Sequence, residues 1–193
     1  TVKNHATGAL YTETYDKLIL SPGAAPILPP LPGIDDPYVF TVRTIPDADR
    51  IKAFIDRQKP AAAVVVGGGF IGLEMAENLA RRGIQITVLE KLEQVLPPLD
   101  PEMAAIVQAA LRKNGVACEL GNGLRAITRQ DGRLHVATEN GPTLVCDLLI
   151  LSVGIRPENT LARDAGLALC ERGHIKVDAA MRKDQAVHPP ALR

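Results

Sequence analysis

The strongest constraint on the fold is a glycine turn that joins an apolar strand to a helix. The run Ala63–Val66 is short and apolar, and it leads into Gly67, Gly69 and Gly72 with the spacing Gly-x-Gly-x-x-Gly. A helical pattern follows without a break. Gly67 permits the tight turn, Gly69 lets a pyrophosphate approach the backbone, and Gly72 lets the helix pack closely on the strand. The motif predicts a dinucleotide site at a helix N-terminus, which favours bound phosphate.

An acidic residue at the end of the next strand indicates which dinucleotide is bound. The strand Ile84–Leu89 leads into Glu90, 18 residues after Gly72. A carboxylate at this point can accept hydrogen bonds from the adenosine ribose diol, and it repels a 2′-phosphate. The sequence therefore predicts NAD(H) rather than NADP(H). The alternative is a glycine-rich turn that binds no ligand.

The order of elements predicts an α/β fold. The helix after Gly72 ends at Gly83, and a second helix runs from Pro101 to about Asn114 before another strand. The next elements are two or three short strands separated by hairpin turns, over Gly123–Arg129, Arg133–Glu139 and Thr143–Leu151. A capping box at Thr44 begins an earlier helix over Asp47–Arg57. We expect a Rossmann-like, doubly wound parallel sheet with a β-meander crossover, plus short β-rich flanking segments, including strands over Val2–Asn4, Leu10–Tyr15 and Lys17–Leu20.

Composition excludes several other classes of protein. The 22 basic and 22 acidic residues cancel, so no nucleic acid or anionic membrane is indicated as a partner. No apolar stretch approaches the roughly 18 residues that span a bilayer. The cysteines are few and widely spaced, which favours reduced thiols in a cytoplasm over a disulfide framework. They are Cys118, Cys146 and Cys170. The four histidines do not cluster at metal-ligand spacings, so no metal site is predicted.

Four segments together resemble a known family. They are residues 18–26, 64–74, 96–103 and 147–157. The chain resembles part of a pyridine nucleotide-disulfide oxidoreductase, and most of all the branch of coenzyme A-disulfide reductases and NADH oxidases or peroxidases. The resemblance implies that residues 1–43 end a first FAD-domain segment, that 44–155 form the NAD(H)-binding domain, and that 156–193 return in part to the FAD domain.

The resemblance also implies an activity for the intact enzyme. Hydride passes from NADH to FAD and then to a disulfide, oxygen or peroxide. The cofactors carry the reactivity and the protein aligns them. The intact enzyme is expected to be a homodimer, and these 193 residues contain no match to its dimerisation domain, its first FAD glycine motif or its redox-active cysteine.

Family roles can be assigned where positions match. No catalytic residue is assigned. The expected cofactor-binding residues are Gly67, Gly69, Phe70, Ile71, Gly72, Glu74, Glu90, Lys91, Val153, Gly154, Ser21 and Gly23. Lys91 is expected to flank the adenine with its alkyl stem. Val153 and Gly154 are expected to line the adenosine end, and Ser21 and Gly23 to lie beside FAD.

Two of these residues have alternative interpretations. Phe70 stands where the family often places an aromatic ring that covers the flavin until nicotinamide displaces it, but it could instead be a hydrophobic staple at the helix start. Glu74 matches a glutamate near the nicotinamide, but it also fits a solvated helix face.

Two other functions use a similar motif. A simpler flavin oxidase would bind FAD at such a turn, but there the motif precedes a segment like Ser21–Pro26 rather than following it. A non-catalytic dinucleotide-sensing module is the second alternative, since fold alone does not fix function.

The resemblance predicts the behaviour of this chain alone. We expect it to be colourless and not to oxidise NADH at enzymatic rates, because hydride transfer needs the nicotinamide within about 3–3.5 Å of a bound flavin. Absorbance in the flavin region and an NADH oxidation assay with added acceptors check this. Rapid NADH oxidation with one FAD per chain would contradict it.

Overall fold

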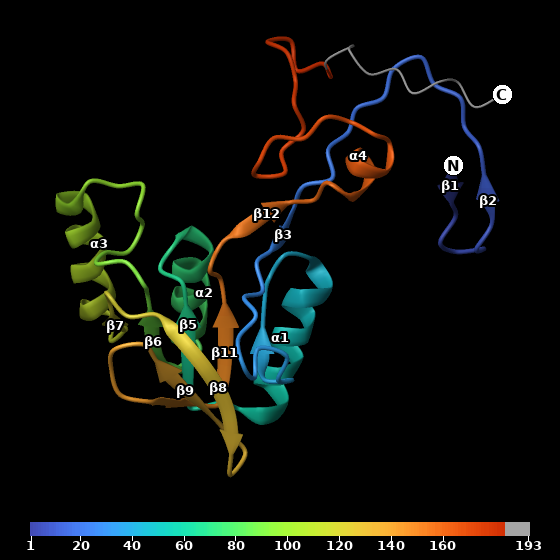
Figure 1. Cartoon of the computed structure of the whole chain (residues 1–193). Helices are drawn as coiled ribbons and strands as arrows, with labels where there is room; N and C mark the ends of the chain where they lie inside the picture. Colours follow the sequence, from blue (N-terminus) through green and yellow to red (C-terminus); the bar gives the residue numbers. More distant parts are fainter. Residues whose placement is uncertain (184–193) are drawn as a thin grey trace.

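The larger lobe of the molecule is built on one parallel sheet (Figure 1). The computed structural model describes residues 1–183. Five strands lie in the order β4-β11-β5-β6-β7, and each neighbouring pair is parallel. Their bounds are β4 Val39–Phe40, β11 Leu148–Leu151, β5 Ala62–Val66, β6 Gln85–Leu89 and β7 Ala117–Glu119. Because the chain winds outward from β5 in both directions, a switch point lies at the carboxyl end of β5.

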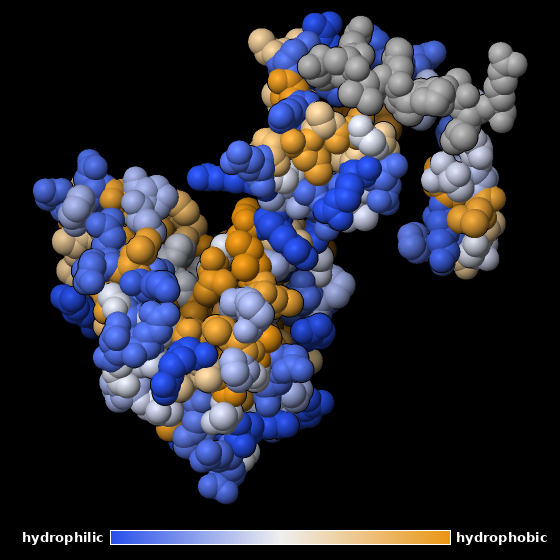
Figure 2. Space-filling model, in the orientation of Figure 1, coloured by the Kyte–Doolittle hydropathy of each residue, from blue (hydrophilic) through white to orange (hydrophobic). Residues whose placement is uncertain are grey.

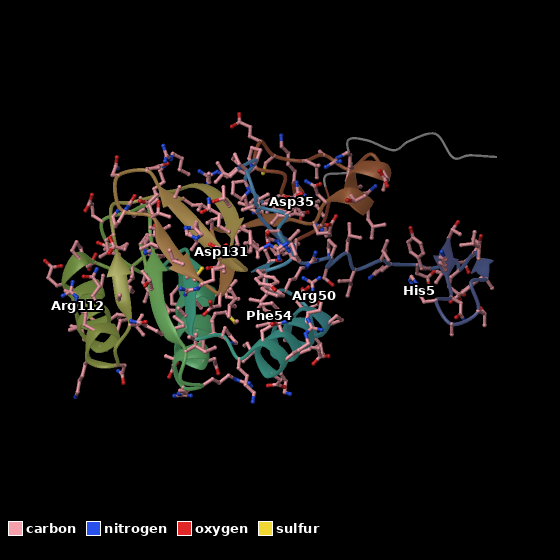
Figure 3. The ribbon with its side chains drawn as sticks, turned by 90° about the horizontal axis from the view of Figure 1, so that it is seen from below. His5, Asp35, Arg50, Phe54, Arg112 and Asp131 are labelled. Carbon is pink, nitrogen blue, oxygen red and sulfur yellow. The ribbon has the colours of Figure 1, made fainter. Side chains whose placement is uncertain are left out.

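Three helices cover one face of this sheet. They are α1 (Ile45–Gln58), α2 (Phe70–Ala80) and α3 (Pro101–Lys113). The predicted capping box is present at the start of α1, where the Thr44 and Asp47 side chains satisfy each other's backbone N–H groups. Phe54 projects from α1 and packs edge-on against two other rings, with centroids 4.9 and 5.1 Å away (Figure 3). Those rings anchor α1 over the edge strand β4.

A small antiparallel sheet covers the opposite face. It contains β8 (Leu124–Gln130), β9 (Arg133–Thr138) and β10 (Leu144–Cys146), in the order β10-β9-β8. Successive residues of β5 face opposite sides of the sheet, as strand geometry requires. Ala63 and Val65 pack toward the helices, whereas Val64 and Val66 pack toward the antiparallel sheet. Strands buried on both faces explain the nearly continuous apolar runs in the sequence. The predicted α/β class with a β-meander crossover is confirmed.

The predicted single strand Thr143–Leu151 is wrong, because the chain changes sheets within it. Residues up to Cys146 pair with β9, and residues from Leu148 pair with β5. Asp147 stands between them. Its Oδ2 accepts hydrogen bonds from the N–H groups of Ala61 and Ala62, both at 2.9 Å, and its Oδ1 accepts one from Arg133 Nε at 2.8 Å.

The flanking segments contain less regular structure than expected. The strands β1 (Val2–Lys3) and β2 (Leu10–Tyr11) form a short ladder, and Lys17–Leu20 forms no strand, since these residues have no partner segment to pair with among the described residues. Residues far apart in sequence meet in a second ladder, β3 (Ala24–Pro26) with β12 (Ile155–Pro157), followed by α4 (Thr160–Asp164). Of the predicted return segment 156–193, residues 184–193 lie outside the described part of the chain.

Exposed apolar side chains gather where the β3–β12 ladder meets the sheet (Figure 2). They include Ile27, Val153 and Ile155. Figure 1 shows the β1–β2 hairpin set apart from this region. Of the helices within residues 1–183, none combines the length and the apolarity that a membrane crossing requires.

Asp147 generates a prediction on stability against pH. Partial burial raises the pKa of this carboxyl, but the amides of Ala62 and Ala61 and the Arg133 guanidinium outweigh it, so its pKa lies below the usual value. The ionised form is therefore stabilised in the folded state. The stability that ionised Asp147 adds to the fold is fully present above the unfolded-state pKa of about 3.9. It is lost as the pH falls through the lower pKa of the folded state.

We therefore expect Asp147→Asn to lower the free energy of unfolding by about 1–3 kcal/mol at neutral pH, because charge-assisted hydrogen bonds are lost. The difference in unfolding free energy between Asp147→Asn and wild type should become smaller below about pH 3.9. Urea unfolding at several pH values measures both. Asp131→Asn, in the exposed turn between β8 and β9 (Figure 3), is the matched control. A difference that stays constant down to acid pH would contradict this role for Asp147.

Candidate dinucleotide site

The turn after β5 takes a path that only glycine permits at its first position. Gly67 has φ 106°, and a Cβ there would lie 2.3 Å from the Ser152 carbonyl oxygen. Its N–H donates to the Leu89 carbonyl at 2.8 Å. The Ser152 hydroxyl, 3.0 Å from the Val66 carbonyl oxygen and 3.2 Å from that of Gly67, is placed to donate to either. The turn is thus fixed from both neighbouring strands.

The other glycines of the motif differ in what surrounds them. A Cβ at Gly72 would lie 1.9 Å from the Gly67 carbonyl oxygen, so α2 crosses the turn in close contact. Gly69 is the N-cap of α2 and has no side-chain cap. A Cβ at Gly69 would meet no heavy atom within 4 Å. The turn is therefore closed at Gly67 and Gly72 and open at Gly69, beside the N–H groups of Phe70 and Ile71 in the first turn of the helix.

Glu90, which directly follows β6, holds the glycine turn in place by accepting a hydrogen bond from it. Its side chain is buried, with 8% of the residue exposed. Oε2 accepts a hydrogen bond from the Gly68 N–H at 2.6 Å, and Oε1 accepts one from the Leu92 N–H at 2.8 Å. Carboxylate oxygens each have a second lone pair. The carboxylate can therefore organise the turn and still accept a hydrogen bond from a ligand hydroxyl.

Lys91 extends from the same strand end into solvent. Its side chain is 71% exposed, and Nζ lies 3.1 Å from Glu139 Oε1. Glu139 follows β9, 48 residues further along the chain. The structure thus places an ammonium group and a second carboxylate beside Glu90.

A groove between α2 and α3 contains two of the predicted residues. Phe70 and Glu74 line it together with Leu73, Leu96 and Leu111. The Phe70 side chain is 63% exposed. This exposure does not favour the alternative in which Phe70 is a packed staple. Glu74 is exposed, as its solvated-face interpretation requires, and it lies one helical turn from Phe70.

The structure separates the remaining predicted residues from Glu90. β11 borders β5 on the side away from β6, so Val153 and Gly154, which follow β11, lie across the glycine turn from Glu90. Their role at the adenosine end stays a prediction. The Gly154 carbonyl accepts a hydrogen bond from the Ile27 N–H at 3.0 Å. Ser21 and Gly23 are exposed on this same side of the chain, next to β3.

The cysteines offer no reactive centre next to the turn. Burial raises the pKa of the Cys118 thiol, and it raises the pKa of Cys146 to about 12. Cys170 lies near His174, with Sγ 3.7 Å from Nδ1, on the hairpin after α4. His5 lies far from the sheet (Figure 3). Within residues 1–183, no group of three or more His, Cys, Asp or Glu side chains is arranged to hold a metal ion.

Three residues of the site were not predicted from sequence. Gly68 supplies the N–H that Glu90 binds, Ser152 braces the turn, and Glu139 pairs with Lys91. A weak signal existed for Ser152, since it directly follows a buried strand at the carboxyl edge of the sheet. Nothing in the local sequence indicates that Glu139 meets Lys91.

The fold and the glycine turn define a nucleotide-binding α/β protein of the Rossmann class. The family profile described as "Pyridine nucleotide-disulphide oxidoreductase" matches residues 1–187, and the chain belongs to that family. The resemblance inferred from the sequence is confirmed.

Relatives and solved structures agree with this assignment. The chain is 38% identical over 172 residues to an NADH oxidase of Methanocaldococcus jannaschii, covering 89% of this chain and 38% of the relative. It is similar to reduced Bacillus anthracis CoADR-RHD, with 47% identity and a TM-score of 0.87 over 94% of this chain and 32% of the other. It is also similar to the water-forming NADH oxidase of Lactobacillus brevis bound to NADH, with 30% identity and a TM-score of 0.82. The match covers 94% of this chain and 40% of that one. The chain thus spans well under half the length of these proteins.

Two alanine substitutions test the geometry of the turn by itself. We expect Gly67→Ala to lower the free energy of unfolding by about 3 kcal/mol or more, because backbone strain adds to a collision with the Ser152 carbonyl. Gly69→Ala should cost about 1 kcal/mol or less, because φ is −78° and the space is open. Urea unfolding of the two variants measures this contrast. Equal destabilisation would show that the turn differs from the one described.

Proposed function

We propose that this chain is the NAD(H)-binding portion of an FAD-dependent oxidoreductase, in which hydride passes from NADH to FAD and on to a disulfide, oxygen or peroxide. One observation carries the proposal. Neighbouring atoms leave no room for a side chain at Gly67 or Gly72, and little at Gly68. At Gly69, by contrast, the space beside the N-terminus of α2 is open. An opening of this kind fits a pyrophosphate, which the helix dipole and the N–H groups would hold.

The surrounding residues fit the rest of NAD(H). Glu90 is positioned to accept a hydrogen bond from the adenosine ribose, and the stem of Lys91 can lie along the adenine. Phe70 and Glu74, in the first turns of α2 directly after Gly69, would flank the nicotinamide end. Nicotinamide and flavin supply the hydride chemistry, and these residues bind and orient the nucleotide.

FAD would meet this chain along the β3–β12 ladder. Ser21 and Gly23 precede β3, and the Gly23 carbonyl accepts a hydrogen bond from the Glu158 N–H at 3.0 Å, which fixes this segment against the end of β12. Both residues are exposed. We therefore assign them contact with one side of the flavin cofactor and no step of the reaction.

The comparisons support the choice of nucleotide. The Lactobacillus brevis oxidase, which this chain resembles over 94% of its length, is bound to NADH in its structure. The family uses FAD together with NAD(P)H. The final electron acceptor of this protein is left open between a disulfide, oxygen and peroxide, because the relatives differ in it.

Binding of the two nucleotides tests the proposal. We expect this chain to bind NADH about tenfold or more tightly than NADPH, because a 2′-phosphate next to the Glu90 carboxylate is unfavourable by about 1–3 kcal/mol. Gly69→Ala should weaken NADH binding at least about tenfold, or about 1.4 kcal/mol, by filling the space that the pyrophosphate needs. Isothermal titration calorimetry measures both affinities.

The two outcomes separate a ligand role from a structural one. Gly69→Ala is expected to retain the fold, so a loss of binding with little loss of stability identifies the opening as the phosphate site. Equal affinity for NADH and NADPH would contradict the role of Glu90. Binding of FAD in place of NADH at this turn would support the simpler flavin oxidase instead.

A further inference from the structure

We propose that Glu139 is a positioning residue that sets nucleotide selectivity through Lys91. The inference rests on the proposed function, since it concerns the adenosine end of the same site. By holding the Lys91 ammonium group in an ion pair, Glu139 withholds a positive charge that a 2′-phosphate would otherwise use. Discrimination against NADPH then comes from two carboxylates, Glu90 and Glu139, rather than from Glu90 alone.

The position of Lys91 makes its charge relevant. It directly follows Glu90, the residue that is expected to meet the ribose. Its side chain is long and 71% exposed, so its ammonium group can reach several positions at this edge of the sheet. In the structure it takes one of them, 3.1 Å from Glu139 Oε1. A lysine immediately after the acidic residue would by itself reduce the repulsion of a 2′-phosphate.

Glu139 is the fixed member of the pair. Its carboxylate lies against Gly123, where a Cβ would come within 2.6 Å of Cδ, so the absence of a side chain at position 123 makes room for it. The Glu139 N–H also donates to the Gly123 carbonyl at 2.8 Å. Glu139 is 39% exposed, about half as much as Lys91.

Further hydrogen bonds tie this part of the antiparallel sheet to the loop of Glu90. The Asn122 N–H donates to the Glu90 carbonyl at 3.0 Å, and Asn122 Oδ1 accepts a hydrogen bond from the Asn140 N–H at 3.0 Å. Asn122 is itself buried. Through Asn122, the backbone of Glu90 is therefore tied to the end of β9, where Glu139 holds the Lys91 ammonium group.

Carboxylates outnumber ammonium groups among the side chains named at this edge. Besides Glu90 and Glu139, Glu93 brings a carboxylate to this edge, where it lies against Gly121. A phosphate monoester brings about −1.5 to −2 charge to this edge. Because an exposed ion pair is weak, Glu139 can only adjust the selectivity that Glu90 establishes. The expected effect is several-fold.

The test compares the NADPH and NADH affinities of this chain by titration calorimetry. We expect Glu139→Gln to raise the ratio of NADPH affinity to NADH affinity about fivefold, because Lys91 becomes free to approach the 2′-phosphate. In a Lys91→Gln background the same substitution should raise the ratio less than about twofold, since the group it acts through is gone. Glu139→Asp, which keeps the charge, should retain most of the wild-type ratio.

Two further variants complete the design. Gly123→Ala displaces the Glu139 carboxylate without removing it and should shift the ratio in the same direction as Glu139→Gln. Asp56→Asn removes an exposed carboxylate that pairs with Lys52 on α1, far from the site, and should leave the ratio as in wild type. The rise in the NADPH-to-NADH affinity ratio caused by Glu139→Gln should also become smaller as the salt concentration is raised.

The outcomes distinguish this inference from the proposed function. If wild type binds NADH and Glu139→Gln lowers stability without moving the ratio, the pair is only a tie between strands and the inference is wrong. An equal rise in the Lys91→Gln background would also overturn it, since Glu139 would then act directly. If wild type binds neither nucleotide, the proposed function fails and this inference fails with it.

Discussion

The arrangement of the site depends on one buried carboxylate that accepts two backbone hydrogen bonds. Glu90 binds the N–H groups of Gly68 and Leu92 and so joins the ends of β5 and β6 to the loops that follow them. A buried charge is tolerated only when such partners are present. The same carboxylate that discriminates between nucleotides in the proposed function thus also holds the phosphate turn in shape. A substitution at Glu90 is expected to change both properties at once.

A second carboxylate, that of Asp147, accepts two backbone hydrogen bonds at the opposite end of β5. Asp147 accepts the N–H groups of Ala61 and Ala62, where the strand begins, and it does so at the point where the chain leaves the antiparallel sheet. The central strand is therefore held at both ends by acidic residues from other strands. This explains how a five-residue strand can be placed accurately enough to position the glycine turn.

The two ends of the proposed nucleotide site are supported by different parts of the chain. The adenosine end depends on β6 and on the antiparallel sheet, through Glu90, Lys91 and Glu139. The opposite end lies toward β11 and the β3–β12 ladder, where the Gly154 carbonyl accepts the Ile27 N–H and residues 155–157 pair with residues 24–26. If Glu139 acts through Lys91 as proposed, the antiparallel sheet both covers one face of the core and takes part in the choice of nucleotide.

The sequence by itself determined the features that depend on neighbouring residues. The glycine turn, the capping box at Thr44 and the presence of α1, α2 and α3 follow from local backbone geometry and periodicity, and each was predicted, although α1 begins at Ile45 rather than at Asp47. Strand order and the pairing of Lys91 with Glu139 were not predicted, and the change of sheet at Asp147 was predicted wrongly as one strand. These features join residues tens of positions apart, and only the packing of both sheet faces brings such residues together.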